Sequence, residues 1–383
     1  MPVHDPGTET VFTYGAPQLK IGTGARHEIG HDLARRDVRR ALVVTDAGLV
    51  ATGAPDEIAD GLRAAGIEVV VYAGVRVEPT DRSLAEAVDF ARAAGPFDAI
   101  VAVGGGSSID TAKAVDLLVT NDGELLDYVN APVGRARAPR HPLLPLVAVP
   151  TTTGTGSEST TVCVLDVVDQ QVKTGISHER LRPTLAVVDP ELTLTQPAGV
   201  TAASGLDVLC HALESYTARP FDSYARKPPE QRVPYCGANP LADVWAERAL
   251  TLMAGSFRRA VTHGDDLQAR TQVAMAATFA GLGFGNAGVH VPHANAYPIA
   301  GRSRGFRPAD YPCYHNIKQW VVHCRELPLS LLRTFEAIRP LSQLPLRLRI
   351  RLPWWSQQCK IALHSSKPLI LRLAQTQTQM WIS

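Results

Sequence analysis

The 383-residue sequence has no apolar run approaching the roughly 18–20 residues that a helix needs to cross a bilayer. It has no excess of one charge either, because 38 Lys and Arg face 37 Asp and Glu. The resulting formal charge of +1 gives no reason to expect nucleic acid or a membrane as a partner. Residues 1–14 lack both an apolar signal core and a basic amphipathic stretch. These absences predict a cytoplasmic protein.

Cys-x-x-Cys pairs are also missing. The six cysteines are widely spaced, at Cys163, Cys210, Cys236, Cys313, Cys324 and Cys359. In a chain of this size, such spacing indicates reduced thiols rather than a disulfide framework or a cysteine-ligated zinc site. The length leaves room for two domains, since domains usually span roughly 100–200 residues.

Short apolar runs alternate with helical patterns in the first half of the chain. The clearest predicted strands are residues 41–45, 68–73, 99–103, 146–149 and 185–188. Nearly continuous apolar runs are typical of strands buried on both faces of a parallel sheet. Between the second and third runs, Leu84, Val88 and Ala91 recur at helical spacing. This alternation predicts an α/β domain over residues 1–192.

The pattern becomes helical in residues 193–305. Apolar residues recur at spacings of three and four, as in Leu206, Leu209 and Leu213. The proline-rich segment 220–240 is predicted to be a loop. We therefore expect a second, all-α domain that begins near residue 193.

Residues 306–383 differ in composition from the rest of the chain. All 30 glycines lie in residues 1–305. The later segment has three acidic residues against eleven Lys or Arg, and it holds four of the five tryptophans. Such a shift is typical of a basic appendage or of a stretch translated in the wrong reading frame.

Two loops rich in glycine or threonine follow predicted strands. In the first, Gly104, Gly105, Gly106 and Ser107 precede a predicted helix, where a diphosphate can approach the backbone and the free N–H groups of the helix. The second, residues 150–158 (PTTTGTGSE), carries hydroxyls that suit a ribose, phosphate or nicotinamide. Each loop alone could be an ordinary tight turn. Two of them in one domain favour a nucleotide.

Asp46 directly follows the predicted strand 41–45. An acidic side chain at this position can accept hydrogen bonds from an adenosine ribose, and it repels the 2′-phosphate of NADP. The alternative is a solvated carboxylate at the end of a strand.

Asp207 and His211 are four residues apart on a predicted helix, so both side chains project from one face. A carboxylate and an imidazole from one helical turn can bind Fe²⁺ or Zn²⁺. His293 could supply a third ligand, with His290 as an alternative. Taken alone, such a pair is more often an incidental salt bridge.

Four segments together resemble the signatures of the iron-containing, group III alcohol dehydrogenase superfamily. They are GGGSSIDTAKAV (104–115), PTTTGTGSE (150–158), ASGLDVLCHALESYT (203–217) and GFGNAGVHVPHANAYPIAG (283–301). The resemblance runs from about residue 12 to about residue 301. It implies the dehydroquinate synthase-like architecture, in which an α/β nucleotide-binding domain precedes a helical domain and the metal lies between them.

The resemblance also assigns roles to individual residues. It implies Fe²⁺ or Zn²⁺ at Asp207, His211 and His293, with NAD as the second cofactor. The implied NAD-binding residues are Asp46, Gly105, Gly106, Ser107, Thr151, Thr152 and Thr155. His290 and His263 receive no role.

Three features point to the transhydrogenase branch of this superfamily. Tyr297 stands where many of the alcohol dehydrogenases have a histidine near the nicotinamide, which makes it a candidate catalytic residue. The proline-rich loop that ends near Trp245 and the segments 75–80 and 126–132 also read like this branch. Its members pass a hydride from 4-hydroxybutyrate to 2-oxoglutarate while NAD stays bound. We thus expect hydroxyacid and oxoacid substrates, and a homo-oligomer.

The resemblance ends before the third metal histidine of the family. That residue belongs to a Pro-His-Gly segment, and the corresponding region here offers only His315 and His323. A change of reading frame near Pro312 explains this loss together with the loss of glycine and acidic residues. Two alternatives remain open: an NAD-dependent alcohol dehydrogenase that releases NADH, and an inactive nucleotide-binding remnant.

Overall fold

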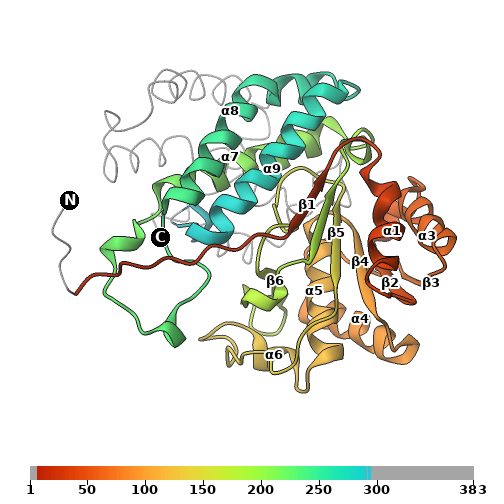
Figure 1. Ribbon diagram of the computed structural model, residues 1–383, viewed down its shortest axis with the longest axis horizontal. Helices are drawn as coiled ribbons and strands as arrows, with labels where there is room; N and C mark the ends of the chain where they lie inside the picture. Colours follow the sequence, from red (N-terminus) through yellow and green to blue (C-terminus); the bar gives the residue numbers. More distant parts are fainter. Residues whose placement is uncertain (1–6, 291, 295–383) are drawn as a thin grey trace, which may run out of the picture.

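The computed structural model describes residues 7–290 and 292–294 (Figure 1). Tyr297, His315, His323 and the segment 306–383 lie outside these residues. The described part consists of a parallel sheet with helices on both faces, beside which α7, α8 and α9 pack together (Figure 1). This arrangement confirms the predicted fold class. None of the helices in the described ranges combines the length and apolarity that a bilayer crossing needs.

All neighbouring strands of the six-stranded sheet are parallel, in the order β1-β8-β5-β4-β2-β3. The strands of this sheet are β1 (Gln18–Ile21), β2 (Arg40–Val44), β3 (Glu68–Tyr72), β4 (Ala99–Gly104), β5 (Leu146–Pro150) and β8 (Leu185–Val188). A separate antiparallel pair consists of β6 (Val162–Val167) and β7 (Val172–Ser177).

The α-helices of the first half are α1 (Ile29–Ala34), α2 (Ala47–Val50), α3 (Ala54–Ala64), α4 (Asp81–Ala94), α5 (Gly106–Thr120) and α6 (Leu125–Tyr128). Those of the second half are α7 (Ala198–Thr217), α8 (Pro240–Thr262) and α9 (Leu267–Ala287). Short 3-10 helices are η1 (Ala25–Glu28), η2 (Glu179–Leu181), η3 (Pro190–Thr193), η4 (Phe221–Ser223) and η5 (Pro229–Gln231). The last two lie in the predicted proline-rich loop.

Alternating side chains of the central strands form two hydrophobic cores, because successive residues of a strand point to opposite faces of a sheet. Leu42 and Val44 pack in one core, with residues of α4 and α5. Ala41 and Val43 pack in the other, with residues of α1 and α3. The strands need apolar residues at every position for this reason, which is why their runs were recognisable in the sequence.

The outer strands differ from the expectation. β3 is an edge strand with an exposed Glu68 and half-buried residues after it, so the prediction that it is buried on both faces is wrong. β1, β6 and β7 were not predicted. β1 has only four residues, with polar Gln18 and Lys20 among them, and gives no apolar run. In β6, half-buried residues alternate with buried ones, because one side of the hairpin packs on the core.

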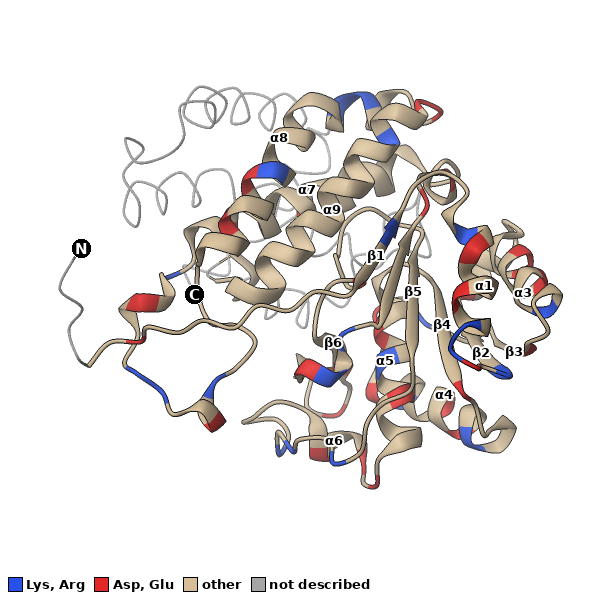
Figure 2. Cartoon of the chain, in the orientation of Figure 1, with Lys and Arg blue, Asp and Glu red and all other residues tan. Residues whose placement is uncertain are grey.

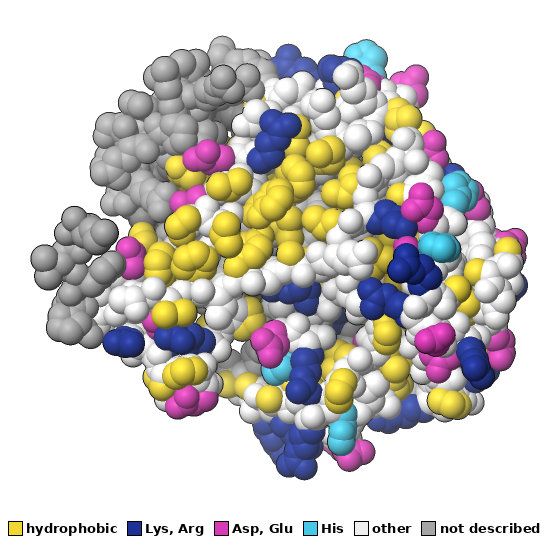
Figure 3. Space-filling view, in the orientation of Figure 1, with side chains coloured by type: hydrophobic (Ala, Val, Ile, Leu, Met, Phe, Trp, Pro, Cys, Tyr) yellow, Lys and Arg dark blue, Asp and Glu magenta, His cyan; other side chains and the backbone are white. Residues whose placement is uncertain are grey.

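The helical half has a core of its own, formed between α7, α8 and α9. The start of α8 follows directly from its sequence: the Asn239 side chain accepts a hydrogen bond from the Ala242 N–H, and Pro240 occupies the first turn. Asp266 caps α9 in the same way. Apolar side chains also reach the surface of the described molecule (Figure 3). Leu241 and Val244 of α8 are among the exposed ones in this half.

Positive and negative side chains are interspersed over both halves of the described chain (Figure 2). Ion pairs between neighbouring side chains, such as Lys20 with Asp32, reflect this mixture.

Candidate functional site

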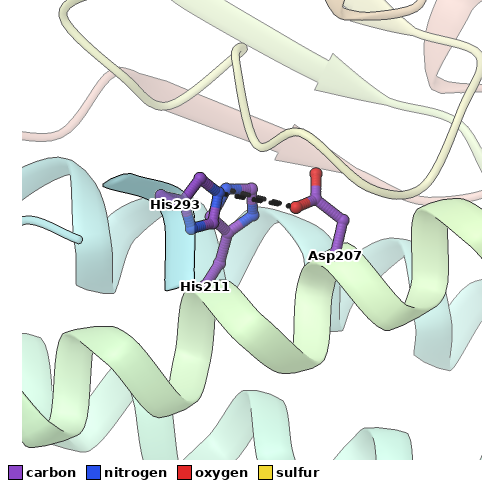
Figure 4. A group of neighbouring side chains, drawn as sticks. All are labelled: Asp207, His211 and His293. Carbon is purple, nitrogen blue, oxygen red and sulfur yellow. Dashed lines mark ion pairs between the residues drawn. The ribbon is translucent and has the colours of Figure 1, made fainter. Parts of the chain in front are cut away.

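Asp207, His211 and His293 converge on one point (Figure 4). Asp207 and His211 lie one turn apart on α7, and His293 comes from the segment after α9. The Asp207 Oδ1 lies 3.6 Å from the Nε2 atoms of both histidines. One ligand atom from each residue lies within 4.8 Å of the other two.

This spacing fits a metal ion. Bonds of roughly 2.0–2.2 Å in a tetrahedral arrangement place ligand atoms roughly 3.4 Å apart. The observed 3.6 Å separations are close to that value. One hard oxygen and two imidazole nitrogens also form a donor set suited to Fe²⁺ or Zn²⁺.

Glu214 supports the cluster from behind, and sequence reasoning missed it. Its Oε1 lies 2.6 Å from His293 Nδ1, so the Nε2 of that ring is left for the cluster. Its Oε2 accepts a hydrogen bond from the His290 backbone N–H at 2.7 Å. Glu214 follows Asp207 by seven residues and His211 by three. This helical spacing is the signal that could have found it.

The charges around His293 favour a cation in the cluster. Burial alone would lower the pKa of His293, but the negative charges of Glu214 and Asp207 outweigh that effect and raise it to about 10. Burial likewise opposes the charge on Glu214, yet the adjacent His293 holds the pKa of that carboxyl below its usual range. The site is therefore built to contain positive charge, which a proton or a metal ion can supply.

Apolar packing orients the two rings. His211 stacks on Phe284 of α9 with ring centroids 4.0 Å apart, and on His293 with centroids 4.7 Å apart. His290 makes a different contact, because its Nε2 lies 2.8 Å from the Thr217 hydroxyl. Of the two histidines considered for the third ligand, His293 joins the cluster and His290 lies outside it.

The predicted nucleotide loops meet at one edge of the sheet. β4 pairs with β5 and with β2, so the segments that follow these three strands lie side by side. The Thr151 N–H donates to the Gly104 carbonyl at 3.0 Å, which joins the two loops directly. Ligands of open α/β sheets bind at this carboxyl edge.

Close packing explains the glycines of the first loop. A Cβ on Gly106 would lie 2.7 Å from the Thr155 side chain, and one on Gly105 would lie 3.1 Å from that of Thr152. No side chain caps the N-terminus of α5, which begins at Gly106. Its backbone donors remain suited to an anionic group.

Two further predicted residues border this edge. Asp46 caps α2 by accepting from the Leu49 N–H at 2.9 Å, and its Oδ2 lies 3.6 Å from the Cβ position of Gly104. The Ser107 hydroxyl accepts a hydrogen bond from the Glu78 N–H at 3.2 Å. Both side chains thus have structural partners beside the glycine loop.

The second loop also touches α7. A Cβ on Gly154 would lie 2.6 Å from the Ser204 Cβ, about one helical turn before Asp207. The threonine loop and the carboxylate–histidine cluster therefore border the same space.

Comparison with known proteins shows which family the chain resembles. Residues 16–190 match the family model described as iron-containing alcohol dehydrogenase, and residues 230–303 match that of its C-terminal part. The chain is 45% identical over 311 residues to a Xenopus laevis protein named hydroxyacid-oxoacid transhydrogenase, mitochondrial, which covers 80% of this chain and 67% of the relative. It spans about two thirds of the length of such relatives.

Solved structures agree. A 1,3-propanediol oxidoreductase superposes with a TM-score of 0.76 at 31% identity, covering 92% of this chain and 87% of that protein. A sulfoacetaldehyde reductase from Bifidobacterium kashiwanohense in complex with NAD⁺ superposes with a TM-score of 0.69 at 25% identity, over 84% of this chain and 77% of that protein.

The predicted cytoplasmic location is wrong. Relatives from Xenopus laevis, Bos taurus, Rattus norvegicus and Homo sapiens are all named mitochondrial. The prediction rested on local composition near residue 1. Receptors recognise targeting segments, and the charge balance of a folded enzyme does not depend on its location. The composition of the chain therefore could not predict the location.

Proposed function

The chain belongs to the iron-containing alcohol dehydrogenase family, and from that premise we propose that it is a metal-dependent, NAD-linked oxidoreductase. Its proposed reaction is hydride transfer from 4-hydroxybutyrate to 2-oxoglutarate, giving succinate semialdehyde and 2-hydroxyglutarate. The observation that carries this proposal is the convergence of Asp207, His211 and His293 beside the predicted nucleotide loops.

The proposed ligands of the cation, Fe²⁺ or Zn²⁺, are Asp207, His211 and His293. When bound, NAD would supply the acceptor and donor of the hydride, and the cation would supply Lewis acidity at the substrate oxygen. Glu214 holds the His293 ring with its Nε2 directed toward the cluster. Such support from a carboxylate raises the basicity of a ligating imidazole.

The nucleotide loops have the complementary task of alignment. We assign the diphosphate to Gly105, Gly106 and Ser107, and the ribose to Asp46. Thr151, Thr152 and Thr155 line the remainder of the cofactor in this proposal. Their joint effect is to hold the two reacting carbons in contact and to exclude water.

Retention of NAD between the oxidation of one substrate and the reduction of the other distinguishes this function from that of an ordinary alcohol dehydrogenase. The second function is favoured by the similarity to 1,3-propanediol oxidoreductase. It predicts that NADH leaves the enzyme after each oxidation.

Isotope transfer tests the two functions. The protein is incubated with 2-oxoglutarate and with 4-hydroxybutyrate that carries deuterium on the hydroxyl-bearing carbon, in an excess of unlabelled free NADH. A transhydrogenase that retains its cofactor moves the deuterium into 2-hydroxyglutarate. Dilution of the label by the free NADH supports the alcohol dehydrogenase. Absence of any oxidation of 4-hydroxybutyrate and of any reduction of 2-oxoglutarate supports the inactive remnant.

We further propose that the helical domain begins near residue 193 and that residues after about 312 are read in another frame. The match to the C-terminal family model ends at residue 303, before the change in composition. Sequencing the transcript across codon 312 tests this. An uninterrupted frame with the printed sequence contradicts the proposal.

A further inference from the structure

Lys113 of α5 is fully buried, and its ammonium group is surrounded by acceptors from a single neighbouring segment. It donates to the Ser157 carbonyl at 2.8 Å and to the Ser157 hydroxyl at 2.9 Å. It also lies 3.2 Å from the Thr160 hydroxyl and 2.7 Å from the Val162 carbonyl. An ammonium has three protons, so these contacts use its whole capacity for hydrogen bonds.

Asp110, one turn earlier on α5, contacts the same segment. Its Oδ1 accepts from the Ser157 hydroxyl at 2.5 Å, and its Oδ2 accepts from the Val164 N–H at 2.9 Å. The Lys113 ammonium lies 3.7 Å from Oδ1. Burial lowers the pKa of Lys113 and raises that of Asp110, so each group depends on the other and on its hydrogen bonds.

Stability alone is a poor explanation for this pair. The desolvation of two buried charges offsets much of their attraction, and apolar residues of similar volume often replace such pairs without loss. The pair instead fixes a position. Its hydrogen bonds are directional, so they hold residues 157–164 in one place relative to α5.

The two elements so joined carry the predicted nucleotide loops. α5 starts at Gly106, and Ser157 lies two residues after Thr155. The opposite side of the same turn contacts α9: the Thr278 hydroxyl donates to Glu158 Oε1 at 2.9 Å. α9 ends a few residues before His293. The turn at residues 156–160 is thus a joint between the glycine loop and the helix that leads to the cluster.

We propose that Lys113 and Asp110 are positioning residues for hydride transfer. Through Ser157 they set the threonine loop at a fixed distance from the glycine loop and from α9. This inference rests on the proposed function for its kinetic part. It gives a role to two charged side chains that belong neither to the cluster nor to the predicted NAD-binding residues.

Three variants of the full chain test the inference. Lys113→Met keeps the length of the side chain but removes the ammonium group. Ser157→Ala removes the hydroxyl that contacts both charged groups and changes little volume. Asp116→Asn is the matched control: it alters another buried carboxyl of α5, which accepts its hydrogen bond from the Leu144 N–H. Each variant is measured for thermal unfolding, bound metal, NADH affinity by fluorescence and single-turnover hydride transfer with its primary deuterium isotope effect.

We expect Lys113→Met and Ser157→Ala to weaken NADH binding by about tenfold, the loss of one charge-assisted hydrogen bond. Hydride transfer should slow by about 100-fold, as for a displacement of about 1 Å, with a fully expressed isotope effect and unchanged bound metal. The control should retain wild-type NADH affinity and rate.

Two results overturn the inference. One is a lower unfolding temperature with NADH affinity and transfer rate within about twofold of wild type, which is the behaviour of a merely structural pair. The other is an equal loss in Asp116→Asn. If Lys113→Met does not fold, Ser157→Ala decides between the outcomes. A wild-type protein that binds NADH but transfers no hydride contradicts only the proposed function. In that case the NADH affinities of the variants still test whether Lys113 and Asp110 position the threonine loop.

Discussion

Glu214 Oε1 lies 2.6 Å from Nδ1 of His293, while Nε2 of the same ring faces the Asp207 carboxylate at 3.6 Å. The imidazole is thus held between two carboxylates, one fully buried behind it and one beside it in the cluster. This geometry, a carboxylate that fixes the ring of a ligating histidine, is the support that metal sites in proteins commonly have.

Glu214→Gln should weaken metal binding by about 10- to 100-fold, because the amide can still accept from Nδ1 but no longer carries the charge that raises the basicity of the imidazole. Competition with a chelator measures the affinity. Glu247→Gln, a change of the same kind on α8, serves as the control. An affinity equal to that of wild type would show that Glu214 only fills space.

His211→Ala should abolish bound metal and metal-dependent hydride transfer, since it removes one of the three proposed ligands. It should leave NADH binding nearly unchanged, because His211 belongs to the cluster and not to the predicted nucleotide loops. Metal analysis and NADH fluorescence on the same sample separate the two effects. His290→Ala is the matched control, because that ring bonds Thr217 instead. Full activity of His211→Ala in the presence of excess metal would contradict the ligand assignment.

Asp46→Gly and Asp46→Ser should both improve NADP binding by about tenfold or more, since a carboxylate repels a nearby 2′-phosphate by roughly 1–4 kcal/mol. The serine variant is the sharper test, because its hydroxyl can still cap α2 in place of the carboxylate that now accepts from Leu49. The measurement is the ratio of NAD to NADP dissociation constants. A ratio that stays constant in both variants would identify Asp46 as a helix cap only.

We expect Asp116 to make the stability of the protein depend on pH. Burial raises the pKa of its carboxyl from 3.8 to about 8 in the folded state. Between about pH 4 and pH 8, the folded protein therefore still holds a proton that the unfolded chain has already released. The free energy of unfolding should fall across this window as pH rises, by up to about 1.4 kcal/mol per pH unit.

Asp116→Asn should remove that dependence. An amide resembles the protonated carboxyl, so wild type and variant should unfold at similar temperatures near pH 4, and the variant should be the more stable near pH 8. Thermal unfolding at both pH values measures the difference. Parallel curves for the two proteins at all pH values would rule out a buried, protonated Asp116.

The sequence alone predicted those features that depend on a single helix or strand. The strands that contain Leu42 and Ile100 are continuous apolar runs because both their faces are buried. Asp207 and His211 are four residues apart, so a helix alone places them on one face. The glycine and threonine loops are candidate nucleotide-binding loops by residue type, and their role stays a prediction.

Contacts between distant segments were beyond the reach of sequence patterns. β1 is a strand only because it pairs with β8, more than 160 residues later in the chain. Glu214 contacts His293 only because the chain after α9 returns to α7, although the two residues are 79 positions apart in the sequence. The hydrogen bonds between Lys113 and Ser157 likewise exist only because α5 packs against the segment that follows β5. Periodicity and residue type report on what a segment needs to bury or expose, whereas the identity of the partner is decided by how the segments pack in three dimensions.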